Sequence, residues 1–193
     1  MYAVVHGVLL APLPYAEPHR LVSVGLQTTE LRQLRQPPAV FDTYRRLARR
    51  LGEVGYYRTG NANFWIEGDG AAAERVTATW VTASMLPLLG VAPLLGRPFT
   101  ADEERLGGSQ AVILSESIWR TRFDARADVI GRTLMVNSVP REIVGVMPAR
   151  FAFPAAAPRL WLPARPALDS VVAAFAYSGV ARLAPGATAE QAQ

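Results

Sequence analysis

The chain has 193 residues, half of them hydrophobic and 19% charged, with a formal net charge of +4. This composition excludes a disordered chain, and the 15 glycines and 15 prolines lack the period of collagen. The absence of cysteine excludes a disulfide-stapled fold, a thiolate zinc site, an iron–sulfur cluster and a cysteine nucleophile. The sequence therefore predicts a globular body of one domain or two small ones, with very little catalytic equipment.

The positive charge comes from arginine alone, since all 20 basic residues are Arg. This usage, together with the many alanines, is more typical of genomic composition bias than of selection for a polyanionic partner. A nucleic-acid-binding domain gathers its charge on one face, whereas the densest cluster here is confined to Arg45, Arg46, Arg49 and Arg50. We therefore expect no nucleic-acid partner.

The first residues are unusually apolar. Tyr2–Leu10 is nearly all hydrophobic, but Pro12 and Pro14 cut the uncharged stretch short of the roughly 18 to 20 residues that a spanning helix needs. No basic residue precedes the apolar part, so it is a poor signal peptide. Two interpretations stay open: the outer end of a longer hydrophobic helix, or a buried N-terminal strand. Because the apolar residues would encircle a helix, we expect the end of a membrane helix.

Residue patterns predict the elements of the first half of the chain. They are a strand over Leu21–Leu26, a helix from Val40 to Leu51 that Gly52 ends, strands over Val54–Ile66 and Glu74–Thr82 around a turn at Gly68–Gly70, and a short helical segment over Ser84–Leu89 that Gly90 ends. The middle and end are richer in strands. They contain a capping box at Thr100 and Glu103, a strand over Ala111–Leu114, a helix over Glu116–Phe123 capped by Ser115, a hairpin over Arg132–Met147 turning at Asn137-Ser138, and strands over Leu160–Pro163 and within Val171–Leu183. This order predicts the α+β class.

Each group that could carry chemistry lacks partners in the sequence. His6 and His19 have no carboxylate at helical spacing, and no serine lies in a Gly-x-Ser-x-Gly elbow. Asp102-Glu103-Glu104 follows Thr100, so we interpret these acids as first-turn residues that face a helix dipole, not as an acid–base pair. Gly107-Gly108 has no following Lys-Ser/Thr and reads as a surface loop, not a phosphate loop.

The arginines from Arg45 to Arg50 form one face of the predicted helix. Four guanidinium groups there could bind phosphate or an anionic surface, but no second basic element or base-stacking aromatic pair accompanies them. We interpret this face as solvated. The sequence thus predicts that the protein is not an enzyme, and we assign no catalytic, cofactor-binding or metal-binding residue and no cofactor.

An ordered set of short motifs resembles one family. The motifs are Val8–Tyr15, Glu17–Val22, Val81–Val91, Leu95–Thr100, Ala111–Ser115, Trp119–Phe123, Ile130–Leu134, Ile143–Pro148, Phe151–Pro154, Trp161–Pro163 and Ala181–Thr188 with Glu190–Ala192. Their order and spacing over nearly the whole chain resemble the MacB-like periplasmic core domain of FtsX-type ABC-transporter permeases. Ala11 stands where the family commonly has a basic residue, and Asn137-Ser138 where Asn-Gly is common.

The resemblance implies a two-lobed fold. Residues 17–90 and 164–193 would form a strand–helix–strand lobe from both ends, and residues 91–163 an inserted strand-rich lobe. Residues 1–16 would be the remnant of a transmembrane helix end and a connector. We expect Trp119, Phe123 and the hairpin in one cluster and Trp80, Tyr44 and Leu47 in another. The capping-box spacing of Thr188 and Gln191 near the end suggests an incomplete first lobe, leaving Val180 and Leu183 poorly covered.

The resemblance also implies a mechanical role on the extracytoplasmic, periplasmic side of the cell membrane. A separate ATP-binding subunit would act through the transmembrane helices, and the domain would couple that motion to export or to a periplasmic partner protein. A second permease copy or a duplicated half would face this one. The alternative is a soluble extracytoplasmic binding module for a peptide or anionic ligand. We expect the chain neither to bind nor to hydrolyse ATP, because it has no Gly-rich phosphate loop.

Overall fold

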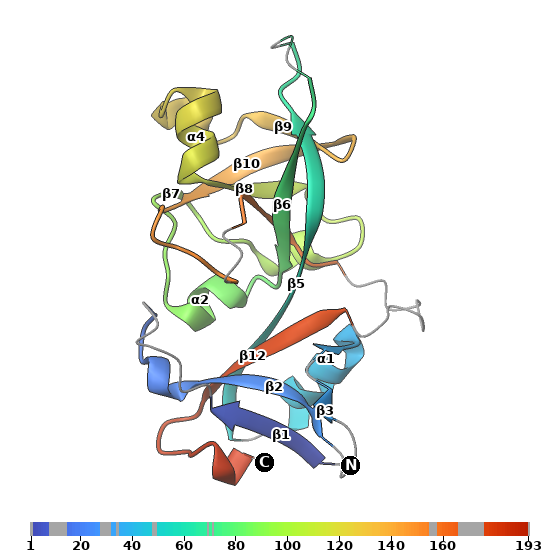
Figure 1. The fold of residues 1–193 in the computed structure, drawn as a ribbon, viewed down its shortest axis with the longest axis vertical. Helices are drawn as coiled ribbons and strands as arrows, with labels where there is room; N and C mark the ends of the chain where they lie inside the picture. The colour runs from blue at the N-terminus through green and yellow to red at the C-terminus, as the bar shows by residue number, and fades with distance from the viewer. Residues whose placement is uncertain are drawn as a thin grey trace. The chain divides into compact units, whose positions relative to one another are not determined.

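The computed structural model describes residues 2–7, 15–27, 32–33, 35–47, 50–68, 70, 72–154, 158–165 and 176–192. The chain divides into two compact units (Figure 1). Unit 1 comprises Met1–Arg58, Ser84–Val91 and Pro166–Gln193, and unit 2 comprises Thr59–Ala83 and Ala92–Arg165. Strand β5, Leu51–Trp65, belongs to unit 1 in its first half and to unit 2 in its second.

Unit 1 is built on an antiparallel sheet. Its strands are β1 (Tyr2–Gly7), β2 (Leu21–Gln27), β12 (Tyr177–Leu183) and the first half of β5, with the short β3 (Arg32–Gln33) beside β2 and β4 (Arg35–Gln36) beside β12. In the centre, Gly179 of β12 pairs with Val24 on one side and Tyr56 on the other. Strands from both ends of the chain therefore lie side by side, as the resemblance implies.

The N-terminal segment differs from its expected helix. Tyr2–Gly7 forms strand β1, which pairs antiparallel with β2 along its whole length, from Tyr2 opposite Gln27 to Gly7 opposite Val22. The ladder satisfies the backbone groups of this Val-containing run, which also has high strand propensity. The prediction of a helix is therefore wrong for Tyr2–Gly7. The rest of the predicted segment, Val8–Leu10, lies outside the described residues. No helix in the described part of the chain is long and apolar enough to cross a membrane.

Helix α1, Pro38–Leu47, packs on the unit 1 sheet through Phe41. The ring of Phe41 is fully buried and stacks on Tyr56, with ring centroids 5.2 Å apart. The helix was expected to continue to Leu51, but Leu51 begins β5 and pairs with Leu183, so Gly52 is not its stop. Burial of Leu51 in the ladder outweighs its favourable helical spacing. Within this core Tyr44 also lies edge-on to Phe41, as expected for a cluster separate from the hairpin.

Unit 2 is built on a mixed sheet. Its strand order is the second half of β5, β6 (Glu74–Val81), β11 (Leu160–Pro163), β8 (Ala111–Ser115), β10 (Val139–Met147) and β7 (Leu95–Gly96), while β9 (Thr133–Val136) pairs with both β10 and β5. The β6–β11 and β8–β10 pairs are parallel, and the pairs β7–β10, β9–β10, β8–β11 and β5–β9 are antiparallel. The class is α+β, as predicted.

The hairpin turn of unit 2 forms as predicted. Asn137 and Ser138 both have positive φ, 51° and 64°, the pattern of a tight two-residue hairpin turn. The turn is also fastened to β5, because Asn137 Oδ1 accepts from Asn63 N at 2.9 Å and Asn137 N donates to Asn63 O at 2.8 Å. This bond explains asparagine at the first turn position.

Short helices in both units have predicted ends. Helix α2, Met85–Leu89, ends at Gly90, which has φ 68°. Helix α3, Ala101–Glu104, carries the capping box of Thr100 and Glu103, and α4, Glu116–Phe123, begins where Ser115 Oγ accepts from Ile118 N at 3.3 Å. The 3-10 turns η1, η2 and η3 span Pro18–Arg20, Ala127–Val129 and Glu190–Ala192.

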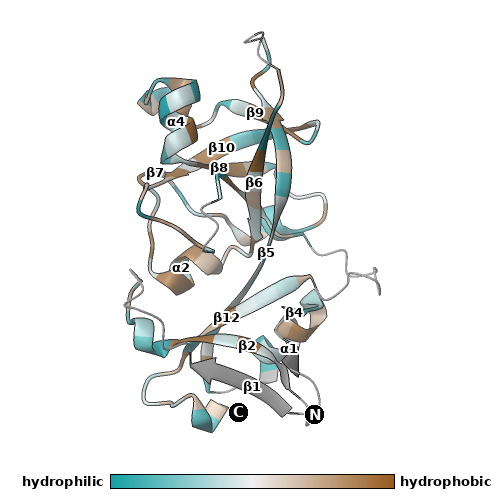
Figure 2. Cartoon of the chain, viewed as in Figure 1, coloured by the Kyte–Doolittle hydropathy of each residue, from teal (hydrophilic) through white to brown (hydrophobic). Residues whose placement is uncertain are grey.

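The core of unit 2 lies between α4 and the sheet. It contains Ala62, Phe64, Val76, Ala78, Val112, Leu114, Ile118, Phe123, Val129, Leu134, Val136, Ile143, Val146, Leu160 and Leu162, and the strands β6, β8 and β10 carry hydrophobic, brown stretches in Figure 2. The hairpin residues and Phe123 cluster as expected, with Trp119 packed against them. Trp80 also packs against this core, so its expected place in the other cluster is wrong.

The division between the units therefore differs from the expected one. Residues 59–83, placed with the ends of the chain by the sequence, lie in unit 2 with 92–165. The reason is that β6 pairs in parallel with β11, with Trp80 opposite Leu162, and thus joins the middle of the chain.

At the C-terminus, Thr188 and Gln191 form reciprocal hydrogen bonds of 3.3 Å. Leu183, expected to be poorly covered, is buried.

Candidate functional site

The described residues contain no histidine site. His19 is exposed on η1, and the side chain of His6 lies outside the described residues. In the described part of the chain, no three His, Cys, Asp or Glu side chains come together as a metal site would require.

The acidic run Asp102-Glu103-Glu104 has structural partners. Glu103 accepts from Thr100 N at 2.7 Å and from Arg97 Nη2 at 2.8 Å, and its side chain is only 3% exposed. Glu104 accepts from Ala83 N, and Asp102 pairs with Arg105. Each carboxylate is thus occupied in ending β6, starting α3 or holding the following turn.

Acid should weaken unit 2 through Glu103. Burial alone would raise the pKa of this carboxyl, but hydrogen bonds from Arg97 and Thr100 outweigh it, so the pKa lies below the ordinary 4.5. A lowered folded-state pKa gives stability that is present above pH 4.5 and is lost as the pH falls through the folded value. Glu103→Gln keeps the capping bond but loses the charge, at a cost of about 1 kcal/mol at pH 7.

Thermal unfolding measured from pH 7 to pH 3 checks this expectation. The difference in melting temperature between the parent chain and Glu103→Gln should shrink as the pH falls below 4.5. A difference that is constant over this range would show that the ion pair of Glu103 does not contribute.

The glycine pair Gly107-Gly108 lies in a loop that hydrogen bonds hold to other parts of the chain. Gly108 N donates to Arg105 O at 3.0 Å, and Gly108 O accepts from Arg165 Nη2 at 2.9 Å. A Cβ at Gly108 would lie 2.0 Å from the carbonyl oxygen of Asp102, so glycine is needed for this close backbone approach. The loop packs tightly against its own chain.

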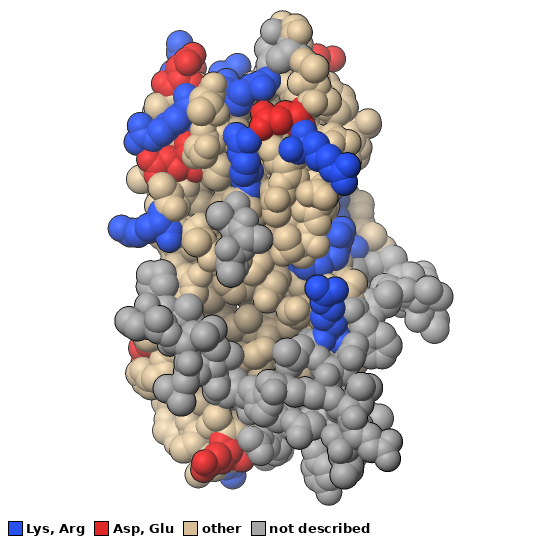
Figure 3. Space-filling model, in the orientation of Figure 1, with Lys and Arg blue, Asp and Glu red and all other residues tan. Residues whose placement is uncertain are grey.

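The arginine face of α1 is only partly solvated. Arg45 turns back onto the sheet, where its Nε donates to Val54 O at 3.1 Å and its guanidinium lies 5.7 Å from the ring centre of Tyr56. Arg46 and Arg50 are exposed, and Arg49 lies outside the described residues. Of the three arginines of this face that the structure describes, Arg45 is therefore engaged with the sheet and only Arg46 and Arg50 extend into solvent. Over α4, arginines and acids are interspersed on the face shown in Figure 3.

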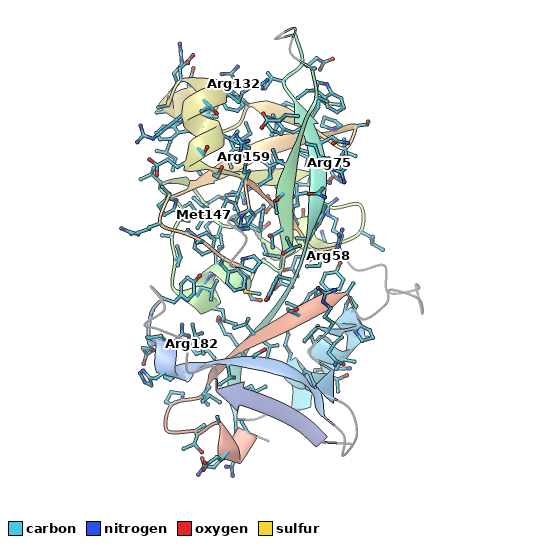
Figure 4. All side chains as sticks on the ribbon, in the orientation of Figure 1. Arg58, Arg75, Arg132, Met147, Arg159 and Arg182 are labelled. Atoms are coloured by element: carbon cyan, nitrogen blue, oxygen red, sulfur yellow. The ribbon has the colours of Figure 1, made fainter. Side chains whose placement is uncertain are left out.

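A cluster of hydrogen bonds and ion pairs in unit 1 surrounds the segment Tyr15–Arg20. Arg182, at the end of β12, donates from Nε to Leu88 O at 3.1 Å and from Nη2 to Ala16 O at 2.8 Å (Figure 4). Its Nη1 lies 3.8 Å from Glu17 Oε2. One guanidinium thus joins β12, the last turn of α2 and the segment that leads into β2.

Arg20, at the end of the segment Tyr15–Arg20, connects that segment to β12. It donates from Nε and Nη2 to Leu183 O at 3.1 and 2.7 Å, and its Nη1 lies 2.8 Å from Glu17 Oε2. The hydrogen bond from Arg20 lowers the pKa of Glu17 below its ordinary value. We call Glu17, Arg20 and Arg182, with the carbonyls of Ala16, Leu88 and Leu183, the arginine clamp.

The backbone around the clamp has two features that let the segment Tyr15–Arg20 lie close to α2. Glu17 has φ 44°, a left-handed conformation that a non-glycine residue adopts only at a cost. Ala16 N donates to Leu89 O at 3.3 Å, and a Cβ at Gly90 would lie 2.5 Å from Cβ of Ala16. Gly90 therefore both ends α2 and lets the segment approach it. Sequence reasoning missed the clamp, although Arg182 stands in a motif that carries the resemblance.

These features define a class of protein: an α+β body built from strands at both ends of the chain, with a second unit formed by the middle. The whole chain, residues 1–193, matches the family model described as the MacB-like periplasmic core domain, and the chain belongs to that family. No match was found among curated proteins.

Solved structures share this fold. The chain is similar to a domain described as part of a permease protein from Porphyromonas gingivalis, with 18% identity, TM-score 0.68 and coverage of 88% of this chain and 77% of that one. It is also similar to the periplasmic region of MacB from Actinobacillus actinomycetemcomitans, with 14% identity, TM-score 0.64 and coverage of 87% and 76%.

A third structure is the extracellular domain of the noncanonic ABC-type transporter YknZ from Gram-positive bacteria. Its identity is 13%, its TM-score 0.61 and its coverage 86% of this chain and 84% of that one. The protein is accordingly the periplasmic or extracellular domain of a MacB-like ABC-transporter permease, a non-catalytic domain, and its membership implies an ATPase partner.

Proposed function

We propose that this domain couples motion driven by ATP hydrolysis to export or to a periplasmic partner protein. A separate ATP-binding subunit hydrolyses ATP, and the transmembrane helices of the permease carry the motion to the domain. A second permease copy, or a duplicated half, faces this one. Family membership over the whole chain supports the proposal, as does the occupation of Glu103, Glu104 and Asp102 in structural contacts.

The arginine clamp is the observation that carries the proposal. The segment Tyr15–Arg20 follows the N-terminal strand β1 and leads into β2, so in this proposal the motion enters unit 1 through the N-terminal part of the chain. The clamp fastens that segment to β12, where Arg20 donates to Leu183 O and Arg182 donates to Ala16 O. Arg182 also joins β12 to α2 through Leu88 O, and Ala16 N joins the segment to α2 through Leu89 O. A displacement of the segment is then shared by the unit 1 sheet as a rigid body, which is how packed domains transmit motion.

The alternative is a soluble extracytoplasmic module that binds a peptide or an anion through the arginine face of α1. The bond from Arg45 to Val54 O withdraws one guanidinium from that face. The alternative also offers no role for the clamp. We therefore place mechanical coupling first.

Replacing Arg182 should uncouple the domain. In the complete reconstituted transporter, Arg182→Ala should leave ATP hydrolysis within about twofold of the parent rate, because the ATP-binding subunit is untouched. A dye on Ala39→Cys, on the exposed side of α1 in unit 1, should lose most of its ATP-dependent fluorescence change. The chain has no native cysteine, so within it the label is unique.

Two variants control for loss of folding. Arg182→Lys keeps the charge but not the branched donor geometry, so its signal should fall between those of the parent and Arg182→Ala. Arg150→Ala, at an exposed arginine, should behave as the parent. An Arg182→Ala protein with normal circular dichroism and an unchanged ATP-dependent signal would rule out the clamp as the coupling element.

A further inference from the structure

Most described arginines of unit 2 have acidic partners. The pairs are Arg97 with Glu103, Arg105 with Asp102, Arg120 with Glu116, Arg126 with Asp128, and both Arg122 and Arg159 with Glu74. Five arginines of unit 2 form no ion pair with a carboxylate in the part of the chain that the structure describes: Arg75, Arg132, Arg141, Arg150 and Arg165. Of these, Arg141 and Arg165 both reach into the same stretch of backbone. Arg141 donates to the first residue of β8, and Arg165 donates to the backbone just before that strand.

Backbone carbonyls fix the position of Arg165. Its Nε donates to Glu103 O at 2.7 Å, and its Nη2 donates to Gly108 O at 2.9 Å and to Ser109 O. These bonds hold the guanidinium in one place but supply no negative charge. Among the described residues, Nη1 of Arg165 donates no hydrogen bond.

Arg141 is held much less well. It extends from β10 to Ala111 O, with a long Nη1–O distance of 3.4 Å, and its buried Nε has no hydrogen-bond partner among the described residues. The neighbouring Gln110 Oε1 is also buried without a partner. Burial, and secondly the charge of Arg165, lower the pKa of Arg141 to about 10, so the guanidinium is still charged at neutral pH.

This arrangement costs folding stability. A buried donor without an acceptor loses its hydration without replacement, and two like charges repel each other. The folding of β10 and β8 requires neither the unpaired donor nor the repulsion between charges. A methionine at position 141 would fill the same volume without a charge. Stability sacrificed at one position is typical of residues kept for binding.

We propose that Arg141 and Arg165 together bind an oxyanion, a carboxylate or phosphate group with at least two acceptor oxygens. Such a group accepts from guanidinium nitrogens in parallel and cancels the repulsion between the two side chains. Inorganic phosphate and an acidic side chain of a periplasmic peptide share this chemistry. The proposal is independent of the coupling role of unit 1.

Stability without and with an oxyanion tests the proposal. In chloride buffer at pH 7, Arg141→Met should melt about 2 to 4 °C above the parent chain, because it removes an unpaired, half-buried charge and its buried Nε donor. The matched control is Arg150→Met, at an exposed arginine, which should not shift the melting temperature. Arg141→Gln, which keeps a polar side chain, is measured in parallel in case methionine disturbs the packing.

Binding is then measured by calorimetry at constant ionic strength with two probes, inorganic phosphate and triglutamate. The parent chain and Arg150→Met should bind with the same affinity, and Arg141→Met should bind at least tenfold more weakly. Tighter binding of phosphate identifies a free ion as the source, and tighter binding of triglutamate identifies a peptide. Equal binding by all three proteins, no binding at all, or an Arg141→Met chain less stable than the parent in chloride would overturn the proposal.

Discussion

Replacing Gly179 with valine is expected to destabilise unit 1 more than any other single change in its sheet. A Cβ at this position would lie 2.2 Å from Cε1 of Phe41, and the Phe41 ring cannot withdraw, because it is fully buried and stacked on Tyr56. Overpacking of this kind costs about 3 kcal/mol. Urea denaturation followed by tyrosine fluorescence measures the loss.

A double substitution separates this clash from a general effect on the strand. Phe41→Leu removes the ring that meets the new side chain, so Gly179→Val should cost much less in a Phe41→Leu background than in the parent. The coupling between the two positions should exceed about 1 kcal/mol, as for residues in direct contact. Additive costs would show that the clash with Phe41 is not the cause.

Replacing Leu114 with alanine is expected to be the most costly single truncation in unit 2. Leu114 lies on β8, is fully buried and belongs to the unit 2 core. Its removal leaves a cavity among rigid strands, and a Leu→Ala change in such a place costs about 3 to 4 kcal/mol. Leu106→Ala is the matched control, because Leu106 is 66% exposed and should change stability by less than about 0.5 kcal/mol.

Hydrogen exchange locates the effect of Leu114→Ala. Amides of β6, β8 and β10 should lose protection, because all three strands contribute to the same core. If Leu114→Ala and Leu106→Ala shift the denaturation midpoint equally, the assignment of this core is wrong.

Local signals in the sequence predicted local structure well. The hydroxyl of Ser115, the pair Thr100 and Glu103, and Gly90 each form the helix end expected of them. Asn137-Ser138 likewise adopts the two positive φ angles of its turn. At the three helix ends the residue and the backbone group that it satisfies lie within four positions of each other, so spacing alone determines the outcome.

Features that depend on distant pairing were not predictable in the same way. The apolar run Tyr2–Gly7 fits a helix or a strand, and its pairing with β2 decides between them. The alternation around Trp80 identifies a strand, but only the neighbour β11 shows which unit holds it. Membership of the family was nevertheless predicted from the ordered motifs and is confirmed by the match over the whole chain.

The arginine clamp was missed for a related reason. The partners of Arg182 are the carbonyls of Leu88 and Ala16, which lie 94 and 166 positions away in the sequence. Every residue has a carbonyl, so the acceptors leave no trace in side-chain types. Arg141 and Arg165 are similar, since the sequence contains 20 arginines and only the structure separates the unpaired ones from the rest.

Hydrogen exchange in the complete transporter tests the mechanical account most directly. Peptides covering Tyr15–Gln27 and Tyr177–Leu183 are compared without nucleotide, during ATP turnover, and with an ATP-binding subunit unable to hydrolyse ATP. The account predicts a change in exchange in both peptides during turnover, no such change with the inactive subunit, and no response of the isolated domain to ATP. Equal exchange under all conditions in the transporter, or a response of the isolated domain to ATP, would contradict it.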